Sequence, residues 1–108
     1  MKLALAQINP TIGDLEGNAE KILRYVEQAK SAGAGLVVFP ELALVGYPPK
    51  DLLSKPSFVD RSLAVLGELA TKVRGIVAMV GCVQRNDRPR GRALFNSVAV
   101  LAEGAVRS

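Results

Sequence analysis

The stretch Gly35–Glu41, "GLVVFPE", decides the fold of this chain. Its apolar residues run continuously instead of alternating with polar ones, which is typical of a strand buried on both faces of a sheet. Pro40 lacks a backbone N–H group for pairing with a neighbouring strand and therefore ends the run. Glu41 then places a carboxylate directly at the end of the predicted strand.

The segment before this strand predicts another strand and a helix. Residues 2–8, "KLALAQI", form a short strand that is largely apolar on both sides. Residues 11–18 are rich in turn formers and end in Asn18, which we expect to be the N-cap of a helix. Apolar residues then recur at helical spacing as far as Ala29, and Gly33 provides the stop. Strand, helix and strand together predict a right-handed βαβ unit with parallel strands.

The segment after Glu41 predicts a second helix and a third strand. The helix opens at Pro56 or Ser57, carries apolar residues on one face and closes at Gly75. An apolar strand follows over residues 76–83. Between Glu41 and this helix the chain is irregular, with one helical turn expected at residues 51–53.

The end of the chain predicts a hairpin. Residues 84–94 form a long loop, and residues 95–102 form a strand. Glu103 and Gly104 make a turn, after which residues 105–108 begin a returning strand. Domains seldom end on a hairpin strand that has just begun, so we expect residues 1–108 to be the N-terminal portion of a longer, truncated α/β domain.

Composition excludes several classes of protein. The chain has 108 residues, 49% of them hydrophobic and 22% charged, which is typical of one small globular domain. Its uncharged runs fall short of the roughly 18 residues that a membrane span requires. It contains no histidine, so no histidine can act as an acid, a base or a metal ligand, and we expect no metal site. The single Cys82 cannot form an internal disulfide, which favours the cytoplasm.

The positive net charge does not predict nucleic-acid binding. Most of the excess of +4 comes from one loop, with Arg85, Arg88, Arg90 and Arg92. This loop contains glycine and proline but no aromatic residue on which a base would stack. A solvated connection is the preferred interpretation, and an anion-binding loop is the alternative.

Glu41 is the candidate catalytic residue. Ligands of open α/β sheets gather at the carboxyl ends of parallel strands, where Glu41 is expected. Apolar neighbours such as Phe39 and Leu44 would raise the pKa of the carboxyl group and suit it to act as a general base. A structural carboxylate that caps backbone amides would occupy the same position, and position alone leaves both interpretations open.

Three segments carry a family resemblance: "ALAQINPTIGDLEGN", "GAGLVVFPELALVGYPPKDLL" and "LFNSVAVLAEG". Together they resemble the opening of the nitrilase superfamily, the carbon–nitrogen hydrolases, in order and spacing. The motif "FPEL" indicates only the superfamily. The "GYPP" and "DLL" segments, with "NPTIGDLEGN", are most similar to the branch formed by the N-terminal glutaminase domains of glutamine-dependent NAD⁺ synthetases.

The resemblance implies a fold and a mechanism. The fold is a four-layer α-β-β-α sandwich, of which this chain would be the N-terminal part. The family uses a Glu-Lys-Cys triad, and Glu41 matches its glutamate, the general base that takes the proton of the cysteine thiol. The thiolate then attacks the amide carbon of glutamine, giving a thioester and ammonia, while the lysine stabilises the oxyanion. Tyr47 is a candidate for substrate binding, with packing against the neighbouring prolines as its alternative role.

The other two members of the triad have no match in residues 1–108. Cys82 lies in an apolar strand where the family has a small or apolar residue, so we interpret it as a core residue. Neither Lys50 nor Lys55 matches the family's lysine. We therefore expect the 108-residue chain to be inactive as an amidase.

The resemblance also implies partners for the whole protein. A further domain, absent here, would use ATP and magnesium to amidate nicotinic acid adenine dinucleotide to NAD⁺ with the ammonia. We expect a cytoplasmic homo-oligomer that binds neither nucleic acid nor membranes and needs no cofactor in this segment. A stand-alone amidase of the same superfamily is one alternative. A non-catalytic α/β module that binds a partner through its free strand edge is the other.

Overall fold

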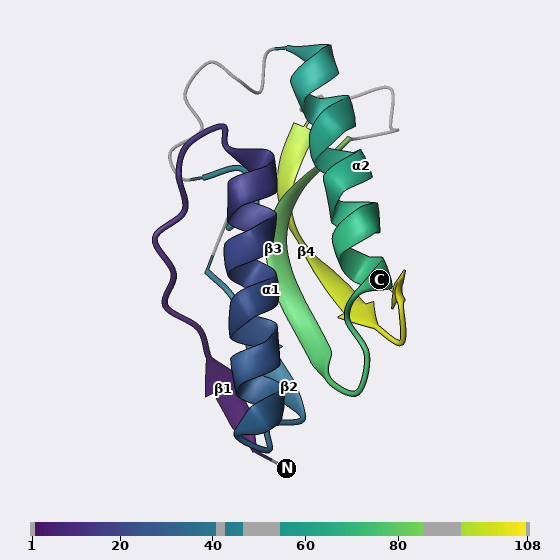
Figure 1. Ribbon diagram of the computed structural model, residues 1–108. Helices are drawn as coiled ribbons and strands as arrows, with labels where there is room; N and C mark the ends of the chain where they lie inside the picture. Colours follow the sequence, from purple (N-terminus) through teal and green to yellow (C-terminus); the bar gives the residue numbers. More distant parts are fainter. Residues whose placement is uncertain (1, 41–42, 47–54, 86–93, 108) are drawn as a thin grey trace.

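The computed structural model describes residues 2–40, 43–46, 55–85 and 94–107 (Figure 1). Two helices, α1 (Leu15–Ser31) and α2 (Pro56–Thr71), lie side by side. The described part of the chain also contains a sheet of five strands, which are β1 (Leu3–Leu5), β2 (Leu36–Val38), β3 (Val77–Arg85), β4 (Leu94–Ala102) and β5 (Ala105–Val106). The expected helical turn at residues 51–53 lies outside the described residues.

The strands follow one another across the sheet in sequence order. β1, β2 and β3 are parallel, with Ala4 opposite Val37 and Val37 opposite Ala78. β3 pairs with β4, and β4 with β5, in antiparallel fashion. The predicted βαβ unit and the predicted C-terminal hairpin are both confirmed. Glu103 and Gly104 have φ angles of 50° and 81°, as a two-residue hairpin turn requires at both central positions.

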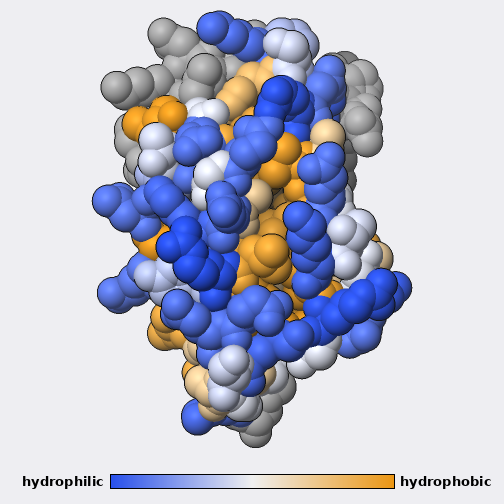
Figure 2. Space-filling model, in the orientation of Figure 1, coloured by the Kyte–Doolittle hydropathy of each residue, from blue (hydrophilic) through white to orange (hydrophobic). Residues whose placement is uncertain are grey.

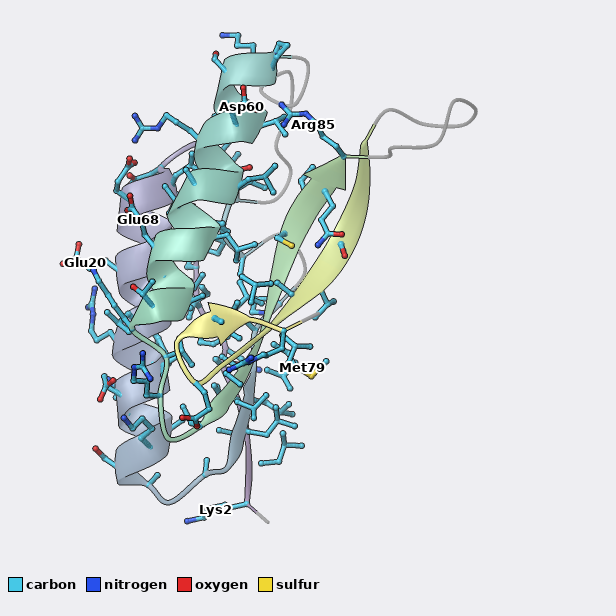
Figure 3. All side chains as sticks on the ribbon, turned by 90° about the vertical axis from the view of Figure 1, so that its right-hand side faces the viewer. Lys2, Glu20, Asp60, Glu68, Met79 and Arg85 are labelled. Carbon is cyan, nitrogen blue, oxygen red and sulfur yellow. The ribbon has the colours of Figure 1, made fainter. Side chains whose placement is uncertain are left out.

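Both helices cover the same face of the sheet (Figures 1 and 3). Side chains alternate between the faces of a strand, so one row across the sheet meets the helices. The buried residues Val37, Ala78 and Leu101 belong to that row and pack with Ile22 and Val26 of α1. The expected α/β class is confirmed, and the chain supplies one helix layer and one sheet of the expected sandwich.

Helix α1 begins earlier than the sequence predicts. Its N-cap is Asp14, whose carboxylate accepts a hydrogen bond from the N–H of Gly17 at 3.1 Å. The prediction that Asn18 caps the helix is wrong, because Leu15 is buried in the core and draws the first turn into the helix. Asn18 instead lies within α1, on its buried side.

Other boundaries differ from the sequence predictions as well, and α2 ends at Thr71, before the predicted stop at Gly75. The first strand is confined to Leu3–Leu5, within the expected residues 2–8, because β2 offers only three residues for pairing. The third strand extends beyond the predicted residue 83 to Arg85, which pairs with Leu94 of β4. Arg85 is therefore a strand residue. The other three arginines of the predicted loop lie outside the described residues.

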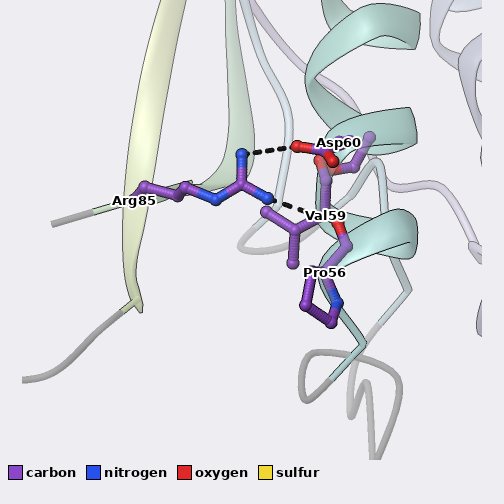
Figure 4. Close-up of polar contacts among 5 residues, drawn as sticks. Pro56, Val59, Asp60 and Arg85 are labelled. Carbon is purple, nitrogen blue, oxygen red and sulfur yellow. Dashed lines mark hydrogen bonds and ion pairs between the residues drawn. The ribbon is translucent and has the colours of Figure 1, made fainter.

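Arg85 links the end of β3 to the start of α2 (Figure 4). Its guanidinium forms an ion pair with Asp60 at 2.6 Å and donates a hydrogen bond to the carbonyl oxygen of Pro56 at 3.2 Å. Both charged side chains are exposed to solvent, 40% for Arg85 and 67% for Asp60, so we expect the ion pair to contribute no more than about 1 kcal/mol. Its effect is local, holding the first turn of α2 against the sheet.

The face of the sheet away from the helices is apolar, and neither described helix covers it. Leu5, Val38, Met79 and Val100 form one row across four strands, and the labelled Met79 points away from the helices (Figure 3). Leu5 is 73% exposed and Val98 is 50% exposed. An apolar surface of this kind is typical of a face that packs against another layer.

We therefore expect the isolated 108-residue chain to self-associate through this face. Sedimentation velocity should show oligomers whose population rises with concentration. Leu5→Lys should shift the distribution toward monomer, because it places a charge on the apolar row. Tyr25→Lys, a matched change at an exposed position of α1, should leave the distribution unaltered. A strictly monomeric chain at all concentrations would contradict this expectation.

Candidate active site

The candidate site lies where β2 ends. The N–H of Phe39 donates to the carbonyl oxygen of Met79 at 2.9 Å, which carries the parallel pairing with β3 past the last residue of β2. The Phe39 side chain is buried, and Pro40 is exposed. The chain thus emerges from the core at the carboxyl edge of the parallel strands, which is where ligands bind in open α/β sheets.

The chain then returns to the core at Ala43–Gly46. The N–H of Ala43 donates to the carbonyl oxygen of Pro40 at 3.2 Å, so a direct hydrogen bond joins the end of the strand segment to the return. Ala43, Leu44 and Val45 are all buried. The N–H of Leu44 approaches the carbonyl oxygen of Gly81 in β3 at 3.4 Å. This short segment, which we call the return segment, is therefore anchored against β3.

The turn before α1 packs against the other side of the return segment. The N–H of Gly13 donates to the carbonyl oxygen of Val45 at 2.9 Å. Gly46 has a φ angle of +86°, and a Cβ atom there would lie 2.6 Å from the Cα of Ile12. Only glycine fits both the backbone conformation and this close approach.

Asn18 joins these two segments through its side-chain amide. Its Nδ2 group donates to the carbonyl oxygens of Thr11 at 2.7 Å and Leu44 at 2.9 Å, and its Oδ1 accepts from the N–H of Thr11 at 2.7 Å. Sequence reasoning missed this role. The available signal was helical spacing, because Asn18 falls on the same face as Leu15 and Ile22, where a polar side chain needs buried partners.

The two predicted site residues themselves, Glu41 and Tyr47, lie outside the described residues. The structure describes the residues next to them in the sequence. Glu41 follows Pro40 directly, and Tyr47 follows Gly46 directly. The predicted roles of both residues stay predictions.

Cys82 lies in the core. Its side chain is 1% exposed and packs among the buried residues of β3 and β4. Burial raises the pKa of the Cys82 thiol, and a hydrogen bond with the backbone of Ala99 opposes this only in part. Because the thiolate is the nucleophilic form, a buried thiol with a raised pKa is a poor nucleophile. The structure thus agrees with the interpretation of Cys82 as a core residue.

We expect iodoacetamide to alkylate Cys82 very slowly in the native chain at neutral pH. Alkylation should accelerate strongly once the chain is unfolded in guanidinium chloride, because unfolding both exposes the thiol and returns its pKa to about 8.5. Mass spectrometry measures both rates. Equal rates in the native and unfolded chain would show that Cys82 is accessible.

The raised pKa also has a consequence for stability. The folded chain holds the thiol proton more tightly than the unfolded chain, so this contribution is complete below the unfolded pKa and is lost as pH rises through the folded pKa. The free energy of unfolding should therefore fall above about pH 8.5. Replacement of Cys82 by alanine should reduce this alkaline fall in the free energy of unfolding, measured by urea titration. An unchanged fall would contradict a raised pKa of the Cys82 thiol.

A shallow groove lies elsewhere, between the outer sides of α1 and α2. Figure 2 shows it as an apolar strip framed by polar side chains. It encloses about 400 Å³ and is lined by Glu16, Ala19, Glu20, Leu23, Val65, Glu68, Leu69 and Lys72. No lining residue comes from the end of β2 or the return segment, so this groove is separate from the candidate site.

The described residues show no other candidate centre. Within them, no group of three or more aspartate, glutamate or cysteine side chains is placed to hold a metal ion. Neither of the described helices is long and apolar enough to span a bilayer.

Residues 2–106 match the family described as carbon-nitrogen hydrolase. The match covers nearly the whole chain, including β2, β3 and α1, which build the candidate site. The chain therefore belongs to the carbon–nitrogen hydrolase family, as its sequence motifs predict.

More particular similarities point to one branch. The chain is 45% identical to the glutamine-dependent NAD⁺ synthetase of Synechocystis sp., over 97% of this chain and 20% of that protein. Its fold matches the glutamine-dependent NAD⁺ synthetase of Acinetobacter baumannii, solved in complex with ADP, with a TM-score of 0.87 and 34% identity. That match covers 98% of this chain and 19% of the other. The chain thus spans about a fifth of the length of the synthetases it matches.

A smaller enzyme of the superfamily is similar too. The amidase of Nesterenkonia sp. AN1 matches all of this chain with a TM-score of 0.73 and 25% identity, and this chain covers 41% of it. The matched structure is a double mutant with glutamate replaced by glutamine and cysteine by alanine, in complex with acrylamide.

Proposed function

We propose that this chain is the N-terminal portion of the glutaminase domain of a glutamine-dependent NAD⁺ synthetase. The similarity to the Synechocystis synthetase carries the proposal, because it extends over 97% of the chain at 45% identity. In the whole protein, glutamine hydrolysis supplies ammonia for the ATP-dependent amidation of nicotinic acid adenine dinucleotide to NAD⁺.

Glu41 acts as the general base in this proposal. Glu41 follows Pro40 directly in the sequence, where the chain leaves the core at the carboxyl edge of the parallel strands. Ligands of open α/β sheets bind at this edge, which supports a catalytic role for the carboxylate. The carboxylate takes the proton of a cysteine thiol, and the thiolate attacks the amide carbon of glutamine. The carbon–nitrogen bond breaks, ammonia leaves and a thioester remains, which water hydrolyses to glutamate. Tyr47, the next residue in the sequence after the return segment, contacts the substrate in this proposal.

The nucleophile comes from outside residues 1–108. Cys82 is the single cysteine of the chain, and it is buried with a raised pKa. The second sheet and second helix layer of the four-layer sandwich also come from other parts of the protein and pack on the apolar sheet face. The chain alone should therefore release no ammonia from glutamine.

The proposal extends to the setting of the enzyme. ATP and magnesium act in a separate synthetase domain, and the segment described here needs no cofactor. The enzyme works in the cytoplasm as a homo-oligomer. The A. baumannii synthetase with bound ADP supports an adenine-nucleotide site in the parent enzyme.

A stand-alone amidase is the second candidate function, favoured by the fold match to the Nesterenkonia enzyme. The lower identity to that amidase, 25% against 45%, ranks it below the synthetase. The substrate separates the two candidates, because only a synthetase couples glutamine hydrolysis to NAD⁺ formation.

The protein encoded by the complete open reading frame provides the test. Glu41→Gln removes the base, so glutamine-dependent NAD⁺ formation should fall by about 10² to 10⁴-fold. NAD⁺ formation from added ammonium salt should persist, because it bypasses glutamine hydrolysis. Glu20→Gln, a matched change on the exposed side of α1, should leave both activities intact. Glutamine-dependent activity that survives in Glu41→Gln would contradict the proposed role of Glu41.

A further inference from the structure

Asn18 has a fully buried side-chain amide whose oxygen and nitrogen both form hydrogen bonds. It is 0% exposed and lies among apolar residues on the inner face of α1. Its Oδ1 faces an N–H donor and its Nδ2 faces two carbonyl oxygens, so the partners fix the orientation of the amide. A buried polar group is costly unless it is hydrogen-bonded, so these three contacts constrain one another.

The contacts of Asn18 are not needed to build α1. They reach out of the helix to Thr11, seven residues before it in sequence, and to Leu44, 26 residues after it. Asp14 already caps the helix. The amide therefore joins two loops, and one of them is the return segment between Glu41 and Tyr47.

Asn18 provides one of the hydrogen bonds that hold the return segment in place. On one side Leu44 approaches Gly81 of β3, and on the other the Asn18 amide holds the carbonyl oxygen of the same Leu44. The hydrogen bond from Gly13 to Val45 adds a third attachment. Because the N–H of Ala43 also donates to Pro40, the chain on both sides of Glu41 and Leu42 is tied down.

We propose that Asn18 is a positioning residue for the reaction: it fixes the backbone of the return segment and, through it, the placement of the Glu41 carboxylate and of Tyr47. The inference rests on the proposed function, because it gives Asn18 a role only if Glu41 is the base. The side-chain hydrogen bonds of Asn18 in the described structure go to the backbone of Thr11 and Leu44. Asn18 therefore acts through the return segment and not on the substrate itself.

The effect of removing the amide should be large and dependent on pH. A displacement of about 1 Å in a catalytic group can cost about 10²-fold in rate. A thiol with a pKa of about 8.5 needs a nearby base most at neutral pH, and less as solvent deprotonates it. Loss of positioning should thus reduce glutaminase kcat/KM by about 10²-fold at pH 7, and by much less near pH 9.

The test uses Asn18→Ala in the protein from the complete open reading frame, with kcat/KM for glutamine measured from pH 6 to pH 9.5. Ser62→Ala is the matched control, because Ser62 is also a buried polar residue, but its hydrogen bond among the described residues stays within α2, to the carbonyl oxygen of Val59. The control should show a pH profile like that of the unaltered protein. NAD⁺ formation from added ammonium salt should be unchanged in both variants.

A second variant covers the case in which Asn18→Ala does not fold. Asn18→Asp keeps the shape of the side chain and the acceptor for the Thr11 N–H, but turns the donations to Thr11 and Leu44 into repulsion between oxygens. It should give the same loss at neutral pH. An unaltered kcat/KM, or a loss that is equal at every pH, would overturn the positioning role.

Glu41→Gln in the same assays keeps the two claims apart. Full activity in that variant contradicts the role of Glu41 as the base, whereas an unaltered protein that forms no NAD⁺ from glutamine contradicts the proposed function. An inactive Glu41→Gln beside a fully active Asn18→Ala contradicts the positioning role alone.

Discussion

The structure at the carboxyl edge of the sheet depends on one buried amide, that of Asn18, which requires hydrogen-bond partners. Asn18 lies on the apolar face of α1, where no water competes for its hydrogen bonds. Its partners are backbone groups of Thr11 and Leu44, one on each side of the βαβ crossover. Meeting that need brings the loop before α1 and the loop after β2 into contact, at the carboxyl edge of the sheet where this family's glutamate is expected.

The surrounding structure makes that contact specific. Gly46 accepts a positive φ angle and leaves room for the backbone of Ile12. Gly81 of β3 holds the return segment from the sheet, because its carbonyl oxygen faces the N–H of Leu44. Pre-organisation of this kind suits a general base, whose effect depends on a short and constant distance to the proton that it takes. A loop held only at its two ends would have to be ordered anew for each substrate molecule.

The sequence predicted the elements whose signals are local. The unbroken apolar run at residues 36–39 indicated β2, helical spacing indicated α1 and α2, and the turn at Glu103 and Gly104 indicated the hairpin. Asp14 and Asn18 are both good N-cap residues, and propensity alone does not choose between them. Burial of Leu15 made the choice, and that depends on tertiary packing. Arg85 extends β3 for a similar reason, since its partner Leu94 is remote in sequence.

The site was predictable only as far as its motif. "FPEL" identified Glu41 as the candidate base, and the sequence context of Cys82 indicated a core residue. The hydrogen bond from Asn18 to Leu44 was not predictable, because it spans 26 residues and depends on how α1 packs over the sheet. Contacts of this type follow from the arrangement of elements, which the local pattern of either loop does not determine.

Amide hydrogen exchange measured by NMR tests the central claim most directly, namely that Asn18 holds the return segment in place. The N–H groups of Thr11, Gly13 and Leu44 should be protected in the unaltered protein and should exchange much faster in Asn18→Ala. Those of Ile22 and Val80, in the core of α1 and β3, should keep their protection. Equal protection of Thr11, Gly13 and Leu44 in both proteins would contradict the account.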